Sequence, residues 1–341
     1  MRGEKTLLSI QVGRALAALA VVLEHVGLLT NDLVGHLPQW ISSLFSQGRL
    51  GVDYFFVTSG FIILTVHMND QRSDLPRYLW KRITRVYIPY LPVVAGIIAV
   101  YILLPTVGQG SRDWGWATSL LLIPTASRPA LTVAWTLVHE IIFYAFFLLF
   151  FVGRRVFFAA VLIWSAAIVA SYIHPIELSA SMDVILQPIN LEFVLGMACA
   201  VGYRILPERY GVALLAAGVV ALIIYFGVWG TEGLRGGIFA IGAALVLLGA
   251  ALAESTFRQF IPNWLVTLGN ASYAIYLIHD PIISVTSRIM ARLLTAEMWA
   301  IAVALTFLVA VMGGLAYHFL FERPALGVVR AVWRKPLAVV G

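Results

Sequence analysis

Apolar runs of about 20 residues recur along the whole of this 341-residue chain, and they constrain its fold more than any other feature. A helix needs roughly 20 mostly apolar residues to cross the hydrocarbon core of a bilayer. The composition agrees, because 61% of the residues are hydrophobic and only 12% are charged. The sequence therefore predicts an all-α, polytopic bundle of transmembrane helices. About ten spans are predicted, at 7–29, 50–67, 84–104, 133–152, 156–173, 185–203, 211–229, 236–253, 266–287 and 299–321.

The distribution of Lys and Arg predicts how these spans are oriented. An even number of spans puts both termini on one side, and the loops of that side carry 16 of the 23 Lys and Arg residues. Positive residues collect in cytoplasmic loops, so both termini are predicted to be cytoplasmic. Residues 1–324 are interpreted as one membrane domain, and residues 325–341 as a short cytoplasmic basic tail. The region 105–132 is predicted to be a loop with a short interfacial or re-entrant helix at 116–123.

Composition also argues against several other classes of protein. A single cysteine, Cys199, allows neither a disulfide framework nor a thiolate metal site, and it is interpreted as a core residue. The net charge of +6 is dispersed among loops, which argues against binding to nucleic acid. No metal is predicted. Arg2 and Lys5 before an apolar run resemble a signal peptide, but Arg14 interrupts that run, so it is interpreted as an uncleaved first span.

Ionisable side chains interrupt the first two predicted spans. Such a residue at the centre of a membrane helix costs about 2.5 to 3.5 kcal/mol, so it usually faces a cavity or a partner. Arg14 and His25 are 11 residues apart, which places them on one helix face about 16 Å apart. Arg14 could instead reach the lipid headgroups, and His25 could pack in a polar pocket. Asp53 is predicted to lie at the depth of His25 and to orient its imidazole, or else to stabilise the start of its own helix.

Two later segments add charged and polar residues at helical spacing. Arg82 and Arg85 project to the same side of a helix, where they could bind phosphates or the headgroups of anionic lipids; spacing does not separate these alternatives. In "WTLVHEIIFY" (135–144), Glu140 and Tyr144 share a face with Thr136.

In the ninth predicted span, "LGNASYAIYLIH" (268–279) places Ser272, Tyr276 and His279 on one stripe, with Tyr273 on its flank. Each of these residues alone could hydrogen-bond between helices. Together with the earlier motifs they indicate a polar core that packing does not require.

The chain resembles the integral-membrane acyltransferase-3 family, and most closely its exopolysaccharide and O-antigen O-acetyltransferases. The resemblance covers nearly the whole chain. The segments that carry it are Arg14 with His25, "GVDYFFVTSGF" (51–61), Arg82 with Arg85, "WTLVHEIIFY" (135–144), "LGNASYAIYLIH" (268–279) and "FERP" (321–324).

The resemblance implies an enzyme of the bacterial cytoplasmic (inner) membrane that uses cytoplasmic acyl-CoA, usually acetyl-CoA. The acyl group would pass to a hydroxyl of a glycan or lipid-linked saccharide at the outer face. The resemblance implies that Arg14, Arg82 and Arg85 bind the donor, that His25 is the catalytic base or nucleophile, and that Asp53, Glu140 and His279 assist it. The implied substrate-binding residues are Trp135, Tyr144, Tyr273 and Tyr276.

A competing interpretation is a transporter that moves acyl groups or a lipid-linked glycan without chemistry. Transporters often contain inverted repeats and helices broken at midplane, and the sequence shows no such symmetry. The identity of the acceptor, the length of the acyl chain and the oligomeric state are not predicted.

Overall fold

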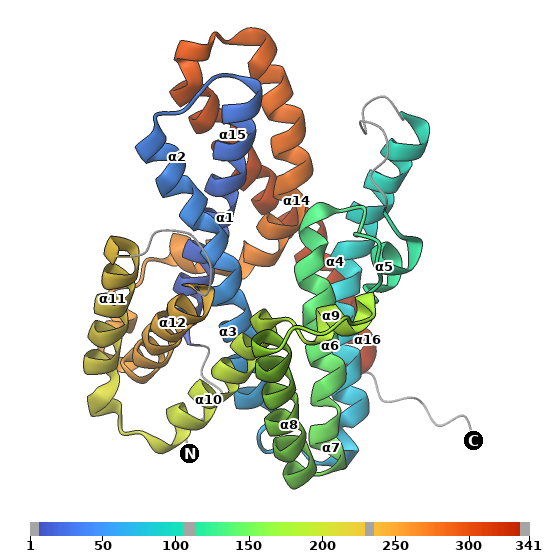
Figure 1. Ribbon diagram of the computed structural model, residues 1–341, viewed down its shortest axis with the longest axis vertical. Helices are drawn as coiled ribbons and strands as arrows, with labels where there is room; N and C mark the ends of the chain where they lie inside the picture. The colour runs from blue at the N-terminus through green and yellow to red at the C-terminus, as the bar shows by residue number, and fades with distance from the viewer. Residues whose placement is uncertain (1–6, 105–113, 229–234, 335–341) are drawn as a thin grey trace.

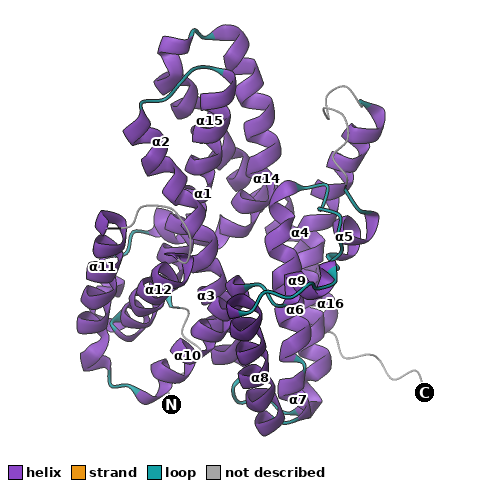
Figure 2. Ribbon diagram, in the orientation of Figure 1, coloured by secondary structure: helices purple, strands orange, loops and turns teal. Residues whose placement is uncertain are grey.

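The structure is a computed structural model that describes residues 7–104, 114–228 and 235–334. These residues form helices and connecting loops (Figure 2), with one isolated bridge between Trp114 and Arg128. The predicted all-α class is confirmed. The α-helices are α1 Leu8–Leu33, α2 Gln39–Ser46, α3 Leu50–His67, α4 Leu75–Leu103, α5 Trp116–Leu121, α6 Trp135–Phe147, α7 Leu149–Val152, α8 Arg154–Ile173, α9 Ala180–Ile185, α10 Leu191–Ile205, α11 Gly211–Val228, α12 Arg235–Leu252, α13 Glu254–Phe257, α14 Asn263–Leu293, α15 Trp299–Tyr317 and α16 Arg323–Arg334.

Every predicted span overlaps a helix, but the helices differ in their capacity to cross a bilayer. Within the described residues, seven helical segments are long and apolar enough to do so, and a pair bent by 69° between α12 and α13 would make an eighth. Of the other two predicted spans, one is α10, which has only 15 residues. The other is α14, which has 31 residues but is interrupted by polar side chains. The short helix predicted at 116–123 is confirmed as α5, whereas the total of ten spans stays a prediction.

Helix α1 lies at the centre of the upper bundle in Figure 1, where it packs against α3, α14 and α15. Small buried side chains on α1, such as Ala17 and Ala18, let these neighbours approach closely. Gly269 of α14 lies against the backbone of Gln11, and further along the same pair of helices the rings of His279 and His25 meet. Helices α1 and α14 therefore run parallel.

Helices α3 and α10 touch at the level of their backbones. A Cβ atom at Gly60 would overlap the carbonyl oxygen of Phe193, and one at Gly196 would overlap the carbonyl oxygen of Val57. The two glycines are thus reciprocal, and each makes room for the other helix. Nearby, Cys199 is buried and its thiol donates to the carbonyl oxygen of Ala244 at 3.5 Å, which confirms its interpretation as a core residue.

The first turn of α1 is capped by a residue far away in the sequence. No side chain from the flanking residues caps this helix. Instead the backbone N–H groups of Leu8 and Ser9 donate to the two carboxylate oxygens of Glu254, at 2.8 and 3.0 Å. A carboxylate at this position satisfies free N–H groups and interacts favourably with the helix dipole. The contact fixes the start of α1 against the bend between α12 and α13.

Replacing Glu254 with alanine is expected to lower the free energy of unfolding by about 1 to 2 kcal/mol, because two partly buried N–H groups lose their acceptor. Glu254→Gln should cost less, since its amide oxygen can still accept one of the two bonds. Thermal unfolding in a single detergent would measure both variants. Equal stability of the alanine variant and the unmodified protein would contradict this account of the cap.

The predicted basic tail begins within a helix. A π-helical segment, His318–Glu322, leads directly into α16, which contacts α4. Residues 335–341 of that tail lie outside the described residues.

Candidate active site

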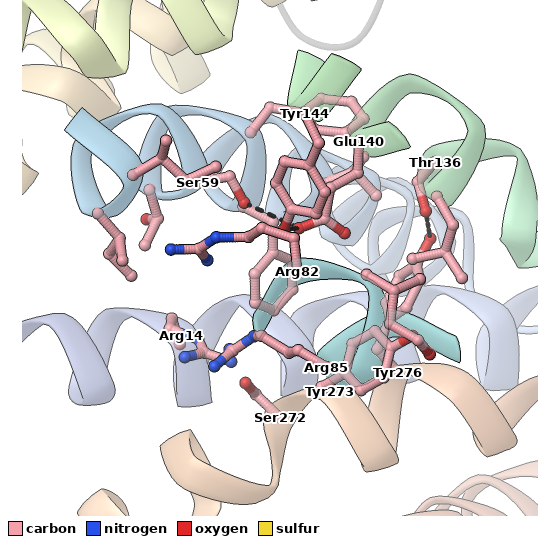
Figure 3. A pocket seen from close by; sticks show the side chains of 18 residues that line it. Arg14, Ser59, Arg82, Arg85, Thr136, Glu140, Tyr144, Ser272, Tyr273 and Tyr276 are labelled. Atoms are coloured by element: carbon pink, nitrogen blue, oxygen red, sulfur yellow. Dashed lines mark hydrogen bonds between the residues drawn. The ribbon is translucent and has the colours of Figure 1, made fainter. Parts of the chain in front are cut away.

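A polar cavity with a volume of about 90 Å³ lies among α1, α3, α4, α6 and α14. Figure 3 shows its lining, in which side chains from all five helices converge. Phe55, Phe56 and Ile62 contribute apolar wall. The polar residues that line it are Arg14, Ser59, Arg82, Arg85, Thr136, Glu140, Tyr144, Ser272, Tyr273 and Tyr276.

Helical spacing explains why these residues meet in one cavity. Arg82 and Arg85 are three residues apart on α4, and Glu140 and Tyr144 are four apart on α6, so each pair projects from a single face. The shared faces predicted from the sequence are confirmed, because all four residues line the cavity. Seven of the eleven predicted site residues lie here, namely Arg14, Arg82, Arg85, Glu140, Tyr144, Tyr273 and Tyr276.

The cavity lining carries an excess of positive charge. Among the described residues that form it, three are arginines and one, Glu140, is a carboxylate. The side chains of Arg14 and Arg85 lie close together beside Ser272 (Figure 3). Guanidinium groups repel one another in an environment that contains little water, and an anion between them relieves that repulsion. The donor set therefore fits a phosphate-bearing ligand.

Arg82 presents a buried hydrogen-bond donor for which the described residues supply no acceptor. Its guanidinium lies over the rings of Tyr78 and Tyr144, at 5.8 and 5.6 Å from their centroids. One terminal nitrogen, Nη2, is 3.0 Å from Nε2 of His67. The Nε atom is buried and has no partner among the described residues. Buried donors are almost always satisfied, so an anionic ligand in the cavity would supply the missing acceptor.

Glu140 is fixed by two hydroxyl groups. Tyr144 donates to its Oε1 atom, and Ser59 of α3 donates to the same oxygen at 3.4 Å. The tyrosines of α14 are fixed through their hydroxyls as well. Tyr273 donates to the carbonyl oxygen of Val86 at 3.0 Å. These bonds tie α14 to α4 and α3 to α6, and they hold the cavity open around its polar centre.

Tyr276 forms the wall of the cavity nearest to His279. Its hydroxyl is 2.9 Å from Oγ1 of Thr136 and 3.1 Å from the carbonyl oxygen of Val133. His279 follows three residues later on α14, about 4.5 Å further along the helix axis. The rings of Tyr276 and His279 are 5.5 Å apart. The cavity thus ends at an aromatic wall with an imidazole directly behind it.

Two histidines meet beyond that wall. The rings of His25 and His279 are 4.9 Å apart and nearly perpendicular. Nδ1 of His25 is 2.9 Å from the carbonyl oxygen of Val21, and Nδ1 of His279 is 2.6 Å from that of Tyr276. A carbonyl oxygen can only accept, so each Nδ1 carries a proton in these bonds, and in the neutral form of each ring Nε2 keeps its lone pair. Nε2 of His279 is buried without a partner among the described residues. The pair therefore presents basic nitrogens.

The prediction that Asp53 orients His25 is wrong. Among the described residues, the side chain of Asp53 hydrogen-bonds that of Glu192 on α10, a contact that requires a proton on one of the two carboxyl groups. Both residues line a separate apolar cavity among α3, α8, α10 and α12. A backbone carbonyl, that of Val21, orients His25 instead. The reason is the rotation of α3 about its axis. Asp53 and His25 can lie at a similar depth in the bilayer without touching, because Asp53 faces α10.

Trp135 also lies outside the polar cavity. Its ring packs against those of Phe56 and His139, at 6.4 and 5.7 Å, and the side chain is 40% exposed. Its predicted role in substrate binding stays a prediction.

Ser59, which lines the cavity, and His67, which contacts Arg82, were not among the site residues predicted from the sequence. Ser59 lies inside the quoted motif 51–61, where one hydroxyl among apolar neighbours was the available signal. For His67 the only signal was an acid three residues later, Asp70.

Comparison with known proteins identifies the class of protein to which this site belongs. A family model described as an acyltransferase domain matches residues 7–317. Exopolysaccharide production protein ExoZ of Rhizobium meliloti (strain 1021) is 30% identical over 311 residues, which cover 85% of this chain and 93% of ExoZ. Acyltransferase MdmB of Streptomyces mycarofaciens is 28% identical over 372 residues, with 95% and 92% covered.

A third relative is the putative peptidoglycan O-acetyltransferase YrhL of Bacillus subtilis (strain 168). It is 26% identical over 360 residues, which cover 91% of this chain but 53% of YrhL. No solved structure matched the chain.

Proposed function

This chain belongs to the acyltransferase-3 family, and from that premise we propose that it transfers an acetyl group from acetyl-CoA to a hydroxyl of a glycan or glycoconjugate. One observation carries the proposal: an arginine-rich cavity with an unpaired buried donor ends at a wall backed by two imidazoles. Phosphates and a reactive acyl group are the two ends of an acyl-CoA, and the cavity and the imidazoles offer a site for each.

Arg14, Arg82 and Arg85 would hold the phosphates of the donor. Guanidinium groups bind phosphate oxygens through paired, charge-assisted hydrogen bonds. The donor must cross or displace the wall formed by Tyr276 to reach His25 and His279. The phenolic and aliphatic side chains of that region suit a thin, uncharged pantetheine arm better than another charged group.

His25 would act on the acceptor through Nε2. In the first mechanism it removes the proton from a sugar hydroxyl, whose oxygen attacks the thioester carbon; the C–S bond breaks, and the imidazolium returns the proton to the leaving thiolate. In the second mechanism Nε2 itself attacks the thioester carbon, the C–S bond breaks, and the CoA thiolate leaves. The hydroxyl oxygen then attacks the acetyl-imidazolium, its proton passes to the thiolate, and the neutral imidazole is restored. Atoms and charges balance in both. A His25 acetyl adduct found by mass spectrometry after addition of acetyl-CoA alone would favour the second mechanism.

The outer face of the cytoplasmic membrane is the proposed location of the acceptor. The distribution of Lys and Arg predicts that the end of α4 that bears Arg82 is cytoplasmic. Helix α1 runs from Arg14, at the same depth as Arg82, toward the outer side of the membrane, where His25 is proposed to lie. The relatives support a glycan acceptor, since one is named for exopolysaccharide production and another for peptidoglycan O-acetylation.

Purified protein in liposomes tests the donor directly. The unmodified protein should release free CoA from acetyl-CoA when a glycan acceptor is supplied. Arg82→Met and Arg85→Met should each raise the KM for acetyl-CoA by about tenfold or more, because each removes a charged hydrogen bond to phosphate. Arg204→Gln is a matched control, since Arg204 bonds Asn69 at the exposed surface.

Two results would contradict the proposal. A transporter would move its cargo without releasing CoA. An unchanged KM in both cavity variants would show that the donor does not bind these arginines.

A further inference from the structure

His67 is a buried histidine with a hydrogen bond at each ring nitrogen. It ends α3, and only 2% of it is exposed. Nδ1 is 2.6 Å from Oδ2 of Asp70, and Nε2 is 3.0 Å from Nη2 of Arg82. Its ring packs edge-on against Tyr78, with 5.1 Å between centroids. His67 does not line the polar cavity, but Arg82 does.

The chemistry of the three groups fixes where the proton of His67 lies. Arginine has N–H donors and no acceptor, so Nε2 of His67 must accept the bond from Arg82. Nδ1 therefore carries the proton of the neutral ring and donates it to the Asp70 carboxylate. The result is a series of two hydrogen bonds, from Arg82 to His67 and from His67 to Asp70. Both bonds can form only when the neutral His67 ring carries its proton on Nδ1.

These hydrogen bonds restrict the side chain of Arg82, which would otherwise adopt several rotamers. Tyr78 and Tyr144 flank the guanidinium of Arg82, and the hydroxyl of Tyr78 donates to the carbonyl oxygen of Tyr144 at 3.0 Å, which joins α4 to α6. The rings limit the plane of the guanidinium, and His67 fixes its rotation within that plane. The buried Nε atom is left without an acceptor in the part of the chain that the structure describes.

We propose that His67, fixed by Asp70, is a positioning residue for the acyl donor site: it holds Arg82 so that the guanidinium is already oriented to bind a phosphate of acyl-CoA. The inference rests on the proposed function and adds to it a residue that acts only through Arg82. An arginine fixed before binding loses less side-chain entropy when the ligand arrives, so the effect falls on donor binding rather than on the transfer step.

A purely structural role for His67 makes a different prediction. If the ring only fills space beside Tyr78 and Phe147, an apolar side chain of similar size would replace it without change in kinetics. His67→Leu tests that role. His67→Gln restores an acceptor oxygen close to the position of Nε2, and it separates the hydrogen bond from the packing.

Steady-state kinetics in liposomes would compare these variants at saturating acceptor. His67→Leu is expected to raise the KM for acetyl-CoA about tenfold while kcat changes less than about threefold, because it removes a hydrogen bond to a charged group. His67→Gln is expected to return KM to within about threefold of the unmodified value. Thermal unfolding of each variant shows whether it is folded under the assay conditions.

A double-mutant cycle tests whether His67 acts through Arg82. In the background of Arg82→Met, adding His67→Leu should cause no further rise in KM. An equal effect in both backgrounds, or a KM unchanged by His67→Leu, would overturn the inference while the proposed function stands. If the unmodified protein neither binds acetyl-CoA nor releases CoA, both the proposed function and this inference fail.

Discussion

Replacing His25 with alanine is expected to lower the rate of acetyl transfer by about a thousandfold, which is the scale of effect for removal of a general base or nucleophile. The expectation rests on geometry. Val21 accepts the Nδ1 proton, which leaves Nε2 as the reactive nitrogen, and His279 packs against the ring at 4.9 Å. Alanine removes the His25 imidazole and, as a good helix former, leaves α1 intact.

The measurement is acetyl transfer to a glycan acceptor by purified protein, with single-turnover rates to separate chemistry from donor binding. His174 offers a control, because it is an exposed histidine at the end of α8 and lies away from the cavity. His174→Ala should retain the full rate. A folded His25→Ala protein that transfers acetyl at the unmodified rate would remove His25 from the mechanism.

Gly196→Ala is expected to lower the free energy of unfolding by about 2 to 3 kcal/mol, because a single methyl group forces α3 and α10 apart. The Cβ atom would overlap the carbonyl oxygen of Val57 and would lie 2.9 Å from the backbone nitrogen of Phe61. A flexible side chain could move away from such a contact, but the backbone of α3 can move only with the whole helix. The Asp53–Glu192 pair spans the same interface, so its contact should be disturbed too.

Gly96 of α4 provides the matched control for this substitution. A Cβ atom there meets nothing within 4 Å, and alanine is a better helix former than glycine. Gly96→Ala should therefore leave the unfolding temperature unchanged or raise it slightly, whereas Gly196→Ala should lower it by several degrees in the same detergent. Equal unfolding temperatures for the two variants would show that α3 and α10 are not in backbone contact.

Local spacing was enough to identify most of the cavity. Arg82 with Arg85 and Glu140 with Tyr144 are separated by three or four residues, and helical geometry places each pair on one face wherever the helix lies. A polar face on an apolar helix must find a cavity or a partner, and all four residues do line one cavity. The buried position of Cys199 followed from the same apolar context.

Contacts between residues on different helices could not be predicted from the spacing of residues along the sequence. Asp53 was predicted to lie at the depth of His25, but depth does not fix how a helix is rotated. In the structure the Asp53 side chain lies against Glu192 of α10, the helix whose Gly196 contacts α3. The bond between Glu254 and the first turn of α1 joins residues 246 positions apart. Nothing in either local segment indicates the other.

The amino-acid sequence is enough to predict a bundle of apolar helices and to predict which residues share a polar face on each helix. Both follow from the period of the α-helix and from the cost of placing charge in hydrocarbon, which are local properties. Three contacts emerge from the folded arrangement of the helices: the ring of His25 packs against that of His279, the carbonyl of Val21 rather than Asp53 orients His25, and His67 hydrogen-bonds Arg82. Those contacts depend on how whole helices rotate and approach one another, and many side chains along each interface set that arrangement together.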